Sequence, residues 1–206
     1  MEIKNFIQKY NAGFAELVSS IEVTKAGNIG CTFEEAVATA VALIKEVQQN
    51  RKKIIFVGNG GSASIASHQA VDYWKNGGIR AIAFNDSSLL TCISNDYSYA
   101  EVFSKPIEQF ADAGDVIFCI SSSGKSANIL AAADMGKTMN CNILTFSGFQ
   151  PDNPLRSKGI LNFYLPALSY GFAEIMHLFI IHCILDAKMY CEDGIDIFNQ
   201  NSVREL

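Results

Sequence analysis

The pattern of apolar and polar positions predicts helices that alternate with strands along most of the chain. Short, continuous apolar runs are typical of buried parallel strands. They cover residues 53–57, 79–84, 115–120, 141–146 and 161–165. Apolar residues at helical spacing predict helices over residues 3–21, 32–47, 62–74, 102–110, 127–139 and 171–189. A short helix is expected after residue 88, followed by a loop over residues 94–97. Thr32 and Glu35 form the capping-box pattern at the start of the second helix.

Alternating strands and helices favour a doubly wound α/β fold with right-handed crossovers. We expect a three-layer αβα sandwich around a five-stranded parallel sheet, within a single domain over residues 1–206. N-terminal helices would occupy residues 1–50, the α/β core residues 51–190, and a C-terminal tail residues 191–206. The tail residues Ile195, Ile197 and Phe198 either pack on a neighbouring subunit or are loosely ordered.

Composition and charge narrow the class of protein. Hydrophobic residues make up 49% of the 206 residues and charged residues 18%, which excludes a disordered chain. The net charge of −5, without a basic run, argues against nucleic acid or an anionic membrane as partner. Six scattered cysteines without a C-x-x-C motif, and no signal-peptide pattern, favour the reducing cytoplasm. The apolar stretch 175–185 is too short to span a bilayer.

A glycine-rich turn follows the first core strand. The sequence Gly58-Asn59-Gly60-Gly61-Ser62 has neither the G-x-G-x-x-G spacing of a dinucleotide site nor the Gly-Lys-Ser/Thr ending of a P-loop. Glycines let the backbone approach a ligand, and the next helix presents free N–H groups that bind anions. The turn is therefore either a ligand-binding loop or a plain strand-to-helix connection.

A serine-rich loop follows the third core strand, at Ser121-Ser122-Ser123-Gly124-Lys125-Ser126. One serine is enough to cap a helix, whereas four hydroxyls beside a helix start make a neutral phosphate cradle. Ligands of doubly wound sheets bind beyond the carboxyl ends of the strands. Both loops follow such ends, so we expect them to lie side by side.

With these two loops the chain resembles the sugar isomerase (SIS) domain family, and within it the phosphoheptose isomerases. The resemblance spans residues 3–189 and includes Ser94-Asn95-Asp96 and a late helix with Glu174, His177 and His182. It implies a flavodoxin-like fold, N-terminal helices at an oligomer interface, and a homotetramer with active sites between subunits. It also implies bound zinc and no nucleotide cofactor.

The resemblance assigns roles to individual residues. The substrate phosphate would bind the serine loop, and the sugar would contact the glycine loop, an acidic residue and the late helix. The substrate-binding residues implied are Asn59, Gly60, Ser62, Asp96, Ser121, Ser122, Ser123, Ser126 and Glu174. The zinc ligands implied are His68, Asp72, Glu174 and His182.

Three positions depart from the family pattern. Asp72 replaces a glutamate that acts as the base, Glu174 replaces a glutamine, and Gly171 stands where the family has an acidic residue. Aspartate is one methylene shorter, and a misplacement of about 1 Å can cost roughly 100-fold in rate. Both acids remain competent zinc ligands, and the extra charge would bind the metal more tightly.

Helical spacing supports part of this ligand set. His68 and Asp72 are four residues apart, hence on one helix face. Glu174 and His182 are eight apart, about 12 Å along a helix. Sharing one metal would need both side chains at full reach, or ligands from two subunits. His177, three residues after Glu174, is a rival ligand or a core residue.

The implied activity is that of an aldose–ketose isomerase. It would convert sedoheptulose 7-phosphate to D-glycero-D-manno-heptopyranose 7-phosphate through an enediol. The product would supply heptose for the biosynthesis of lipopolysaccharide or capsule. Asp72 would be the base and His182 the acid, with zinc or Asn59 and Ser62 polarising the oxygen. Alternatives are a non-catalytic sugar-phosphate-binding protein, a partner of the replication initiator, or an isomerase of another sugar phosphate. The histidines His68 and His182 favour catalysis, since a scaffold has no chemical need for them.

Overall fold

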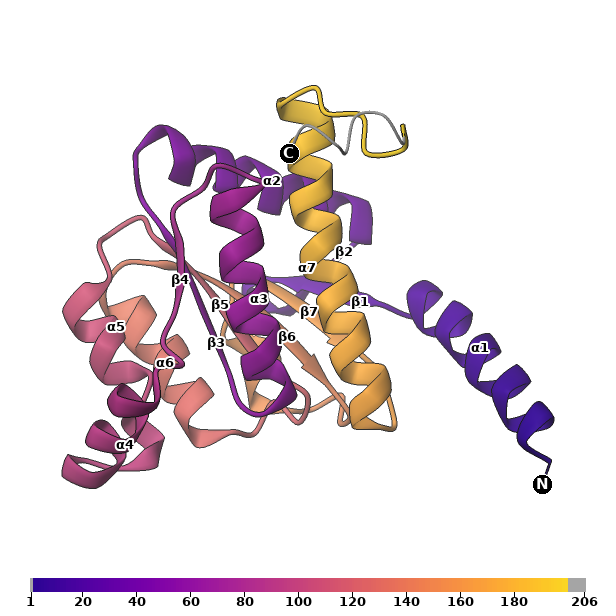
Figure 1. Cartoon of the computed structure of the whole chain (residues 1–206), viewed down its shortest axis with the longest axis horizontal. Coiled ribbons are helices and arrows are strands. Elements are labelled where there is room, and N and C mark those ends of the chain that lie inside the picture. The colour runs from indigo at the N-terminus through magenta and orange to yellow at the C-terminus, as the bar shows by residue number, and fades with distance from the viewer. Residues whose placement is uncertain (1, 200–206) are drawn as a thin grey trace.

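A computed structural model describes residues 2–199 of the chain (Figure 1). Seven strands form one sheet in the order β2-β1-β7-β6-β5-β3-β4. The strands are β1 (Glu22–Lys25), β2 (Ile29–Cys31), β3 (Ile54–Gly58), β4 (Ala81–Ala83), β5 (Val116–Ser121), β6 (Asn142–Gly148) and β7 (Leu161–Leu165).

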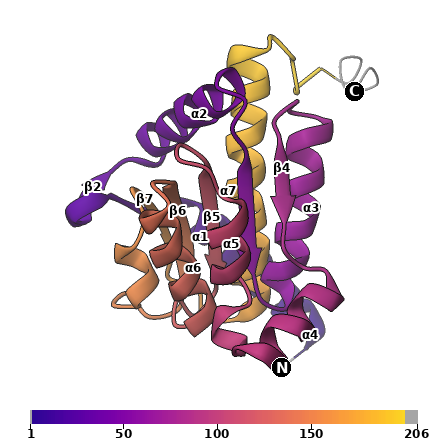
Figure 2. The same cartoon turned by 90° about the vertical axis from the view of Figure 1, so that its left-hand side faces the viewer.

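Helices connect these strands and cover both faces of the sheet (Figure 2). The α-helices are α1 (Ile3–Ser19), α2 (Phe33–Gln49), α3 (Gly61–Lys75), α4 (Ser87–Asp96), α5 (Ser104–Phe110), α6 (Ala127–Thr138) and α7 (Tyr170–Glu192). Short 3₁₀ helices lie at Ala26–Asn28, Tyr99–Glu101 and Pro154–Ser157. The predicted capping box at Thr32 and Glu35 is present at the start of α2.

The predicted five-stranded parallel sheet is confirmed by strands β4, β3, β5, β6 and β7, which pair in parallel in that order. The sequence prediction missed β1 and β2, which extend this sheet because β1 pairs antiparallel with β7 and β2 pairs antiparallel with β1. Both strands are short, and β7, the partner of β1, lies more than a hundred residues away in sequence. Val23 is buried opposite Phe163, so tertiary contact rather than local pattern makes β1 a strand.

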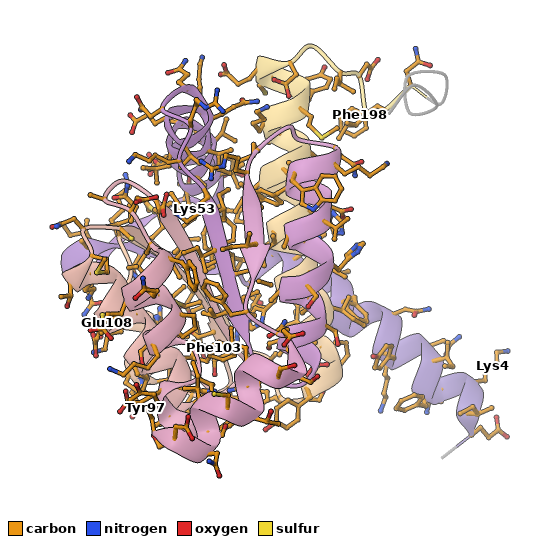
Figure 3. The ribbon with its side chains drawn as sticks, turned by 60° about the vertical axis from the view of Figure 1, so that its left-hand side comes forward. Lys4, Lys53, Tyr97, Phe103, Glu108 and Phe198 are labelled. Carbon is orange, nitrogen blue, oxygen red and sulfur yellow. The ribbon has the colours of Figure 1, made fainter. Side chains whose placement is uncertain are left out.

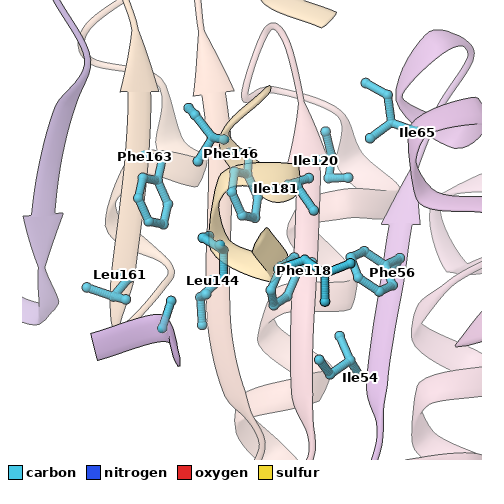
Figure 4. Close-up of a cluster of buried hydrophobic side chains, with 14 of the residues drawn as sticks. Ile54, Phe56, Ile65, Phe118, Ile120, Leu144, Phe146, Leu161, Phe163 and Ile181 are labelled. Carbon is cyan, nitrogen blue, oxygen red and sulfur yellow. The ribbon is translucent and has the colours of Figure 1, made fainter. Parts of the chain in front are cut away.

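Two hydrophobic clusters fill the layers on either side of the sheet. Figure 4 shows the larger one, where Phe56, Phe118, Phe146 and Phe163 form a row across four neighbouring strands. Helices α2, α3 and α7 cover this face, and α5 and α6 cover the other. Figure 3 shows Phe103 inside the second layer, where it is 1% exposed. The three-layer αβα architecture therefore matches the prediction.

The connection after β4 differs from its prediction. Residues 94–97 were expected in a loop, but α4 extends to Asp96. Asp86 caps this helix because its side chain accepts hydrogen bonds from the backbone N–H groups of Ser88 and Leu89. The helix expected over residues 102–110 is α5, which begins two residues later, at Ser104, after the 3₁₀ helix Tyr99–Glu101.

The two terminal helices differ in their packing. By length and composition α7 could cross a membrane, which the shorter apolar run in the sequence did not predict. Its buried residues, among them Met176 and Ile180, instead pack in the larger core cluster. Helix α1 projects from the body (Figure 1) and contacts it through rings, with Tyr10 stacked on Phe172 at 4.5 Å.

The predicted tail lies only partly within the described residues. Ile195 packs against the larger core cluster, and Phe198 meets the ring of Tyr190 while remaining 82% exposed. Residues 200–206 lie outside the described part. The expectation that the tail contacts a neighbouring subunit stays a prediction.

Candidate functional site

The glycine loop and the serine loop lie side by side, as predicted. They follow β3 and β5, which are neighbours in the sheet with Gly58 opposite Ile120. A Cβ atom on Gly58 would lie 2.5 Å from the carbonyl oxygen of Ser62, so only glycine fits where the chain folds back into α3. The local sequence therefore brings the start of α3 against the carboxyl end of β5.

A pocket of about 220 Å³ opens between these two loops. It is lined by backbone and side-chain polar groups from both loops and from the start of α7. The lining residues are Asn59, Gly60, Gly61, Ser62, Ile120, Ser121, Ser122, Ser123, Ser126, Tyr170 and Glu174. All predicted substrate residues except Asp96 line this pocket, and Tyr170 joins them. Asp96 is exposed at the end of α4, where it pairs with Asn95.

The serine loop presents an anion-binding surface to this pocket. Ser121 and Ser122 are buried, and the Ser121 Oγ lies 3.2 Å from the Ser126 Oγ. Ser126 is the N-cap of α6, yet its side chain makes no capping hydrogen bond. The first backbone N–H groups of α6 are therefore free of a side-chain cap and can donate hydrogen bonds to another acceptor. A phosphate is a suitable acceptor at such a helix start.

Asn59 is held in place by two residues that the sequence did not single out. Its amide exchanges two hydrogen bonds of 2.8 Å with the amide of Asn128, which is 3% exposed at the start of α6. The hydroxyl of Tyr99 also donates to the Asn59 Oδ1 at 3.1 Å. These contacts tie the glycine loop to the helix that follows the serine loop, so the two halves of the pocket are fixed together.

A second group of polar side chains lies further along α3, where it faces α7. One ligand atom each from His68, Asp72 and His182 falls within 4.8 Å of the others. The Asp72 Oδ2 lies 3.2 Å from the His68 Nε2 and 3.8 Å from the His182 Nδ1. The shorter side chain of aspartate thus still reaches both histidines. Two imidazoles and a carboxylate are the donor types that zinc takes in catalytic sites.

Glu174, the fourth zinc ligand implied by the resemblance, does not belong to this group. Its carboxylate lies against the start of α3, where a Cβ atom on Gly61 would be 2.3 Å from the carboxyl carbon. The structure places Glu174 in the pocket between the glycine loop and the serine loop, two turns of α7 away from His182. The full-reach arrangement within one subunit is therefore not adopted.

Asp186 is a titratable neighbour that the sequence reasoning missed. It lies one turn after His182 on α7, and burial raises the pKa of its carboxyl. The negative charge of Asp72 raises this pKa further, whereas His182 lowers it. The four-residue spacing from His182 was the available signal, since it puts both side chains on one helix face.

His177 is a core residue rather than a zinc ligand. It is fully buried, its ring meets that of Phe146, and neither ring nitrogen makes a hydrogen bond of normal geometry within the described residues. Burial lowers the pKa of His177 to about 4, and the nearby backbone of Ser147 opposes this only weakly. The imidazole is therefore neutral and isolated from the other two histidines.

The buried His177 is expected to make the fold sensitive to acid. Between pH 6.5 and about 4 the unfolded chain binds a proton that the native chain does not, so stability falls as the pH falls. The difference between 6.5 and about 4 corresponds to about 3 kcal/mol over this window. His177→Met should remove this share of the acid destabilisation. Urea unfolding of both proteins at pH 7 and pH 4.5 measures it, and equal losses would contradict the expectation.

Known proteins resemble the chain in sequence. A sequence profile of the SIS domain family matches residues 9–148. The phosphoheptose isomerase of Helicobacter hepaticus is 35% identical over 161 residues, which cover 75% of this chain and 82% of that protein. The similarity therefore includes the glycine loop, the serine loop and the helices between them.

Solved structures show the same fold. The phosphoheptose isomerase of Neisseria gonorrhoeae superposes with a TM-score of 0.78 at 27% identity, covering 91% of this chain and 99% of that one. A phosphoheptose isomerase from Francisella tularensis superposes with a TM-score of 0.75 at 20% identity, covering 91% and 98%. The match reaches nearly from end to end of those chains.

Proposed function

The chain belongs to the SIS domain family and, within it, to the phosphoheptose isomerases, and we propose that it interconverts sedoheptulose 7-phosphate and D-glycero-D-manno-heptopyranose 7-phosphate. It is thus an isomerase. The observation that carries the proposed reaction is the meeting of His68, Asp72 and His182 within 4.8 Å, on the same two helices that border the serine-lined pocket. A protein that only binds a sugar phosphate needs the pocket but not this group.

The pocket would hold the phosphate and orient the sugar. Serine hydroxyls and the N–H groups at the start of α6 meet the phosphate, while Asn59 and Ser62 face the sugar. Asp72 lies ten residues after Ser62, about 15 Å along α3 at 1.5 Å per residue. An extended seven-carbon sugar, anchored at its phosphate, directs its far carbons toward this end of the helix. Remote phosphate binding then orients the reacting carbons.

The reaction moves a proton between two adjacent carbons. Asp72 would remove the proton from carbon as the base, and His182 would protonate the neighbouring carbonyl oxygen as the acid. The two groups face each other, with the Asp72 Oδ2 3.8 Å from the His182 Nδ1. Ser62 lies about 15 Å from Asp72 along α3, so Ser62 and the neighbouring Asn59 would bind the sugar rather than the oxygen on which charge develops. The enediol then collapses to product when protonated Asp72 returns the proton to the neighbouring carbon and the hydroxyl on the first carbon gives its proton back to His182.

His68, Asp72 and His182 would also hold zinc. The donor set fits, since each of the three offers a nitrogen or carboxylate oxygen within 4.8 Å of the others. Zinc bound there would polarise the oxygen of the substrate as a Lewis acid. A fourth ligand from another subunit remains compatible with this arrangement.

Two substitutions distinguish this ligand set from the one that includes Glu174. His68→Ala should weaken zinc binding by at least tenfold, because it removes one of three ligands. Glu174→Gln should leave zinc affinity within about twofold, because Glu174 lies in the pocket instead. Competition with a chromophoric chelator measures both constants. A large loss in Glu174→Gln would restore Glu174 as a ligand.

Turnover of sedoheptulose 7-phosphate by the purified chain, with and without zinc, tests the proposed function directly. Formation of the heptose product supports it. Sugar-phosphate binding without turnover would instead favour a non-catalytic binding protein. Turnover only of another sugar phosphate would keep the chemistry and change the substrate.

We further propose a cytoplasmic homotetramer. Helix α1 stands away from the body and leaves Ile3, Phe6 and Ile7 between 48% and 75% exposed. A projecting apolar helix suits an interface between copies of the chain. This supports the expected role of the N-terminal helices in assembly, and light scattering of the purified protein reports its mass.

A further inference from the structure

Gln69 contacts His182, although no motif in the sequence marks it. Its side chain is fully buried on the inner face of α3, next to His68 in sequence but pointing to α7. The Gln69 Nε2 lies 2.8 Å from the His182 Nε2. We propose that Gln69 is a positioning residue that holds the Nε2 of His182 and thereby places the ring proton on Nδ1 in the metal-free protein. This inference rests on the catalytic and zinc-binding roles proposed for His182.

Hydrogen-bond chemistry determines the protonation of the ring. An amide NH₂ group only donates, so the His182 Nε2 accepts from Gln69 and carries no proton itself. The proton of the neutral imidazole is then on Nδ1. That nitrogen lies 3.8 Å from the carboxylate of Asp72, which favours an N–H group there. Both neighbours therefore select the same tautomer in the metal-free protein.

This tautomer separates two roles of His182 that the sequence could not separate. With its proton on Nδ1, the ring presents an acid to Asp72 and the substrate. A metal needs the lone pair of the same nitrogen, because Nε2 is occupied by Gln69. His182 is thus a proton donor in one tautomer and a zinc ligand in the other.

The amide of Gln69 is suited to support either tautomer. Turned by 180°, it would present Oε1 to His182 and accept a proton from Nε2, which frees the lone pair on Nδ1. In the observed orientation Oε1 is buried without a hydrogen-bond partner among the described residues. No second partner therefore locks the amide in one orientation. Zinc loading is expected to reverse the amide and to move the proton to Nε2.

Nitrogen spectroscopy of the full chain reads these states without an activity assay. The chain has three histidines, so ¹⁵N-histidine labelling and long-range ¹H–¹⁵N spectra resolve each ring, with His182→Gln to assign it. Metal-free wild type should show His182 protonated on Nδ1 alone. Gln69→Met should give a mixture of tautomers, and Gln69→Glu should place a proton on Nε2. A wild-type ring protonated on Nε2, or identical tautomers in all three proteins, would overturn the proposal.

Zinc affinity gives a second readout. Because an accepting carboxylate favours the liganding tautomer, Gln69→Glu should tighten zinc binding by about 10- to 100-fold. Tyr73→Phe is the matched control. It removes the hydrogen bond from the buried Tyr73 hydroxyl to the Ile181 carbonyl, at the same contact between α3 and α7, without touching His182. The control should change neither the tautomer nor the zinc affinity. If it changes them as Gln69→Met does, Gln69 has only a structural role.

These outcomes are separable from the proposed function. If the wild type fails to turn over sedoheptulose 7-phosphate while the tautomer responds to Gln69, the isomerase reaction is wrong and the positioning role stands. If turnover is normal and the tautomer is indifferent to Gln69, the positioning role is wrong and the proposed function stands.

Discussion

His182→Gln is expected to abolish isomerisation of sedoheptulose 7-phosphate while sugar-phosphate binding persists. Glutamine can donate a hydrogen bond but cannot release and take up a proton near neutral pH. Loss of a general acid costs roughly 100- to 10,000-fold in rate. Binding should persist because His182 does not line the pocket between the two loops. Product formation measures kcat, and calorimetry with the sugar phosphate measures the dissociation constant.

A double variant tests whether His182 and Asp72 act as one unit. Asp72→Asn should lose as much activity as His182→Gln, because it removes the proposed base. If the pair shares one proton-transfer step, the double variant should be about as inactive as the worse single variant. Activity losses that multiply would show two independent contributions instead. Nearly full activity in His182→Gln would remove His182 from the mechanism, and with it the strongest argument against a pure binding protein.

The local sequence pattern was enough to predict the strands whose own residues are mostly apolar and buried. Of the five parallel strands, β3, β5, β6 and β7 are buried along most of their length, whereas only Ala81 is buried in the edge strand β4. Strand β1 is different, because only Val23 is buried and its partners on β7 are distant in sequence. Helix α4 was shortened in the prediction because Ser94-Asn95-Asp96 has turn-like composition, whereas the cap at Asp86 and the packing of the helix decide its length.

The pocket between the two loops followed from topology, while the proposed acid–base group required the tertiary structure. Two loops at the ends of adjacent parallel strands must meet, so their residues could be grouped from sequence alone. The ligand set was transferred by resemblance, and only the coordinates show that Glu174 lies in the pocket. No sequence motif marks Gln69, because a glutamine in a helix is usually exposed to solvent. Its burial here depends on how α7 packs against α3.

The reach of Asp72 shows how the fold accommodates a shorter acid. The sequence comparison raised the concern that losing one methylene would misplace the base. In the structure the Asp72 carboxylate contacts His68 directly and faces His182. Asp186, one turn beyond His182, is a further carboxyl in this neighbourhood, and burial raises its pKa. The proposed base Asp72 therefore lies within reach of the proposed acid His182 despite its shorter side chain.

Gly124→Ala is expected to disable the phosphate site. Gly124 has φ = +61°, which costs an alanine about 1–2 kcal/mol. Its new Cβ would also lie 1.9 Å from the Asn153 Oδ1. Asn153 is 2% exposed and its amide donates to Ser147, Gly148 and Gln150, so it cannot move without breaking buried hydrogen bonds. Each such loss costs about 1–3 kcal/mol.

The serine loop must therefore change conformation in Gly124→Ala. If this change costs about 3 kcal/mol of binding free energy, the phosphate binds roughly 100-fold more weakly. Gly78→Ala is the matched control. Gly78 has φ = +64°, and the nearest atom to a new Cβ is 3.5 Å away. Gly78→Ala therefore introduces the same backbone strain as Gly124→Ala but no steric clash. Calorimetric titration with inorganic phosphate and thermal unfolding compare the two. If Gly124→Ala binds phosphate as tightly as Gly78→Ala does, the geometry of the serine loop does not determine phosphate binding. If only Gly124→Ala loses binding, the hydroxyls and N–H groups of this loop hold the phosphate.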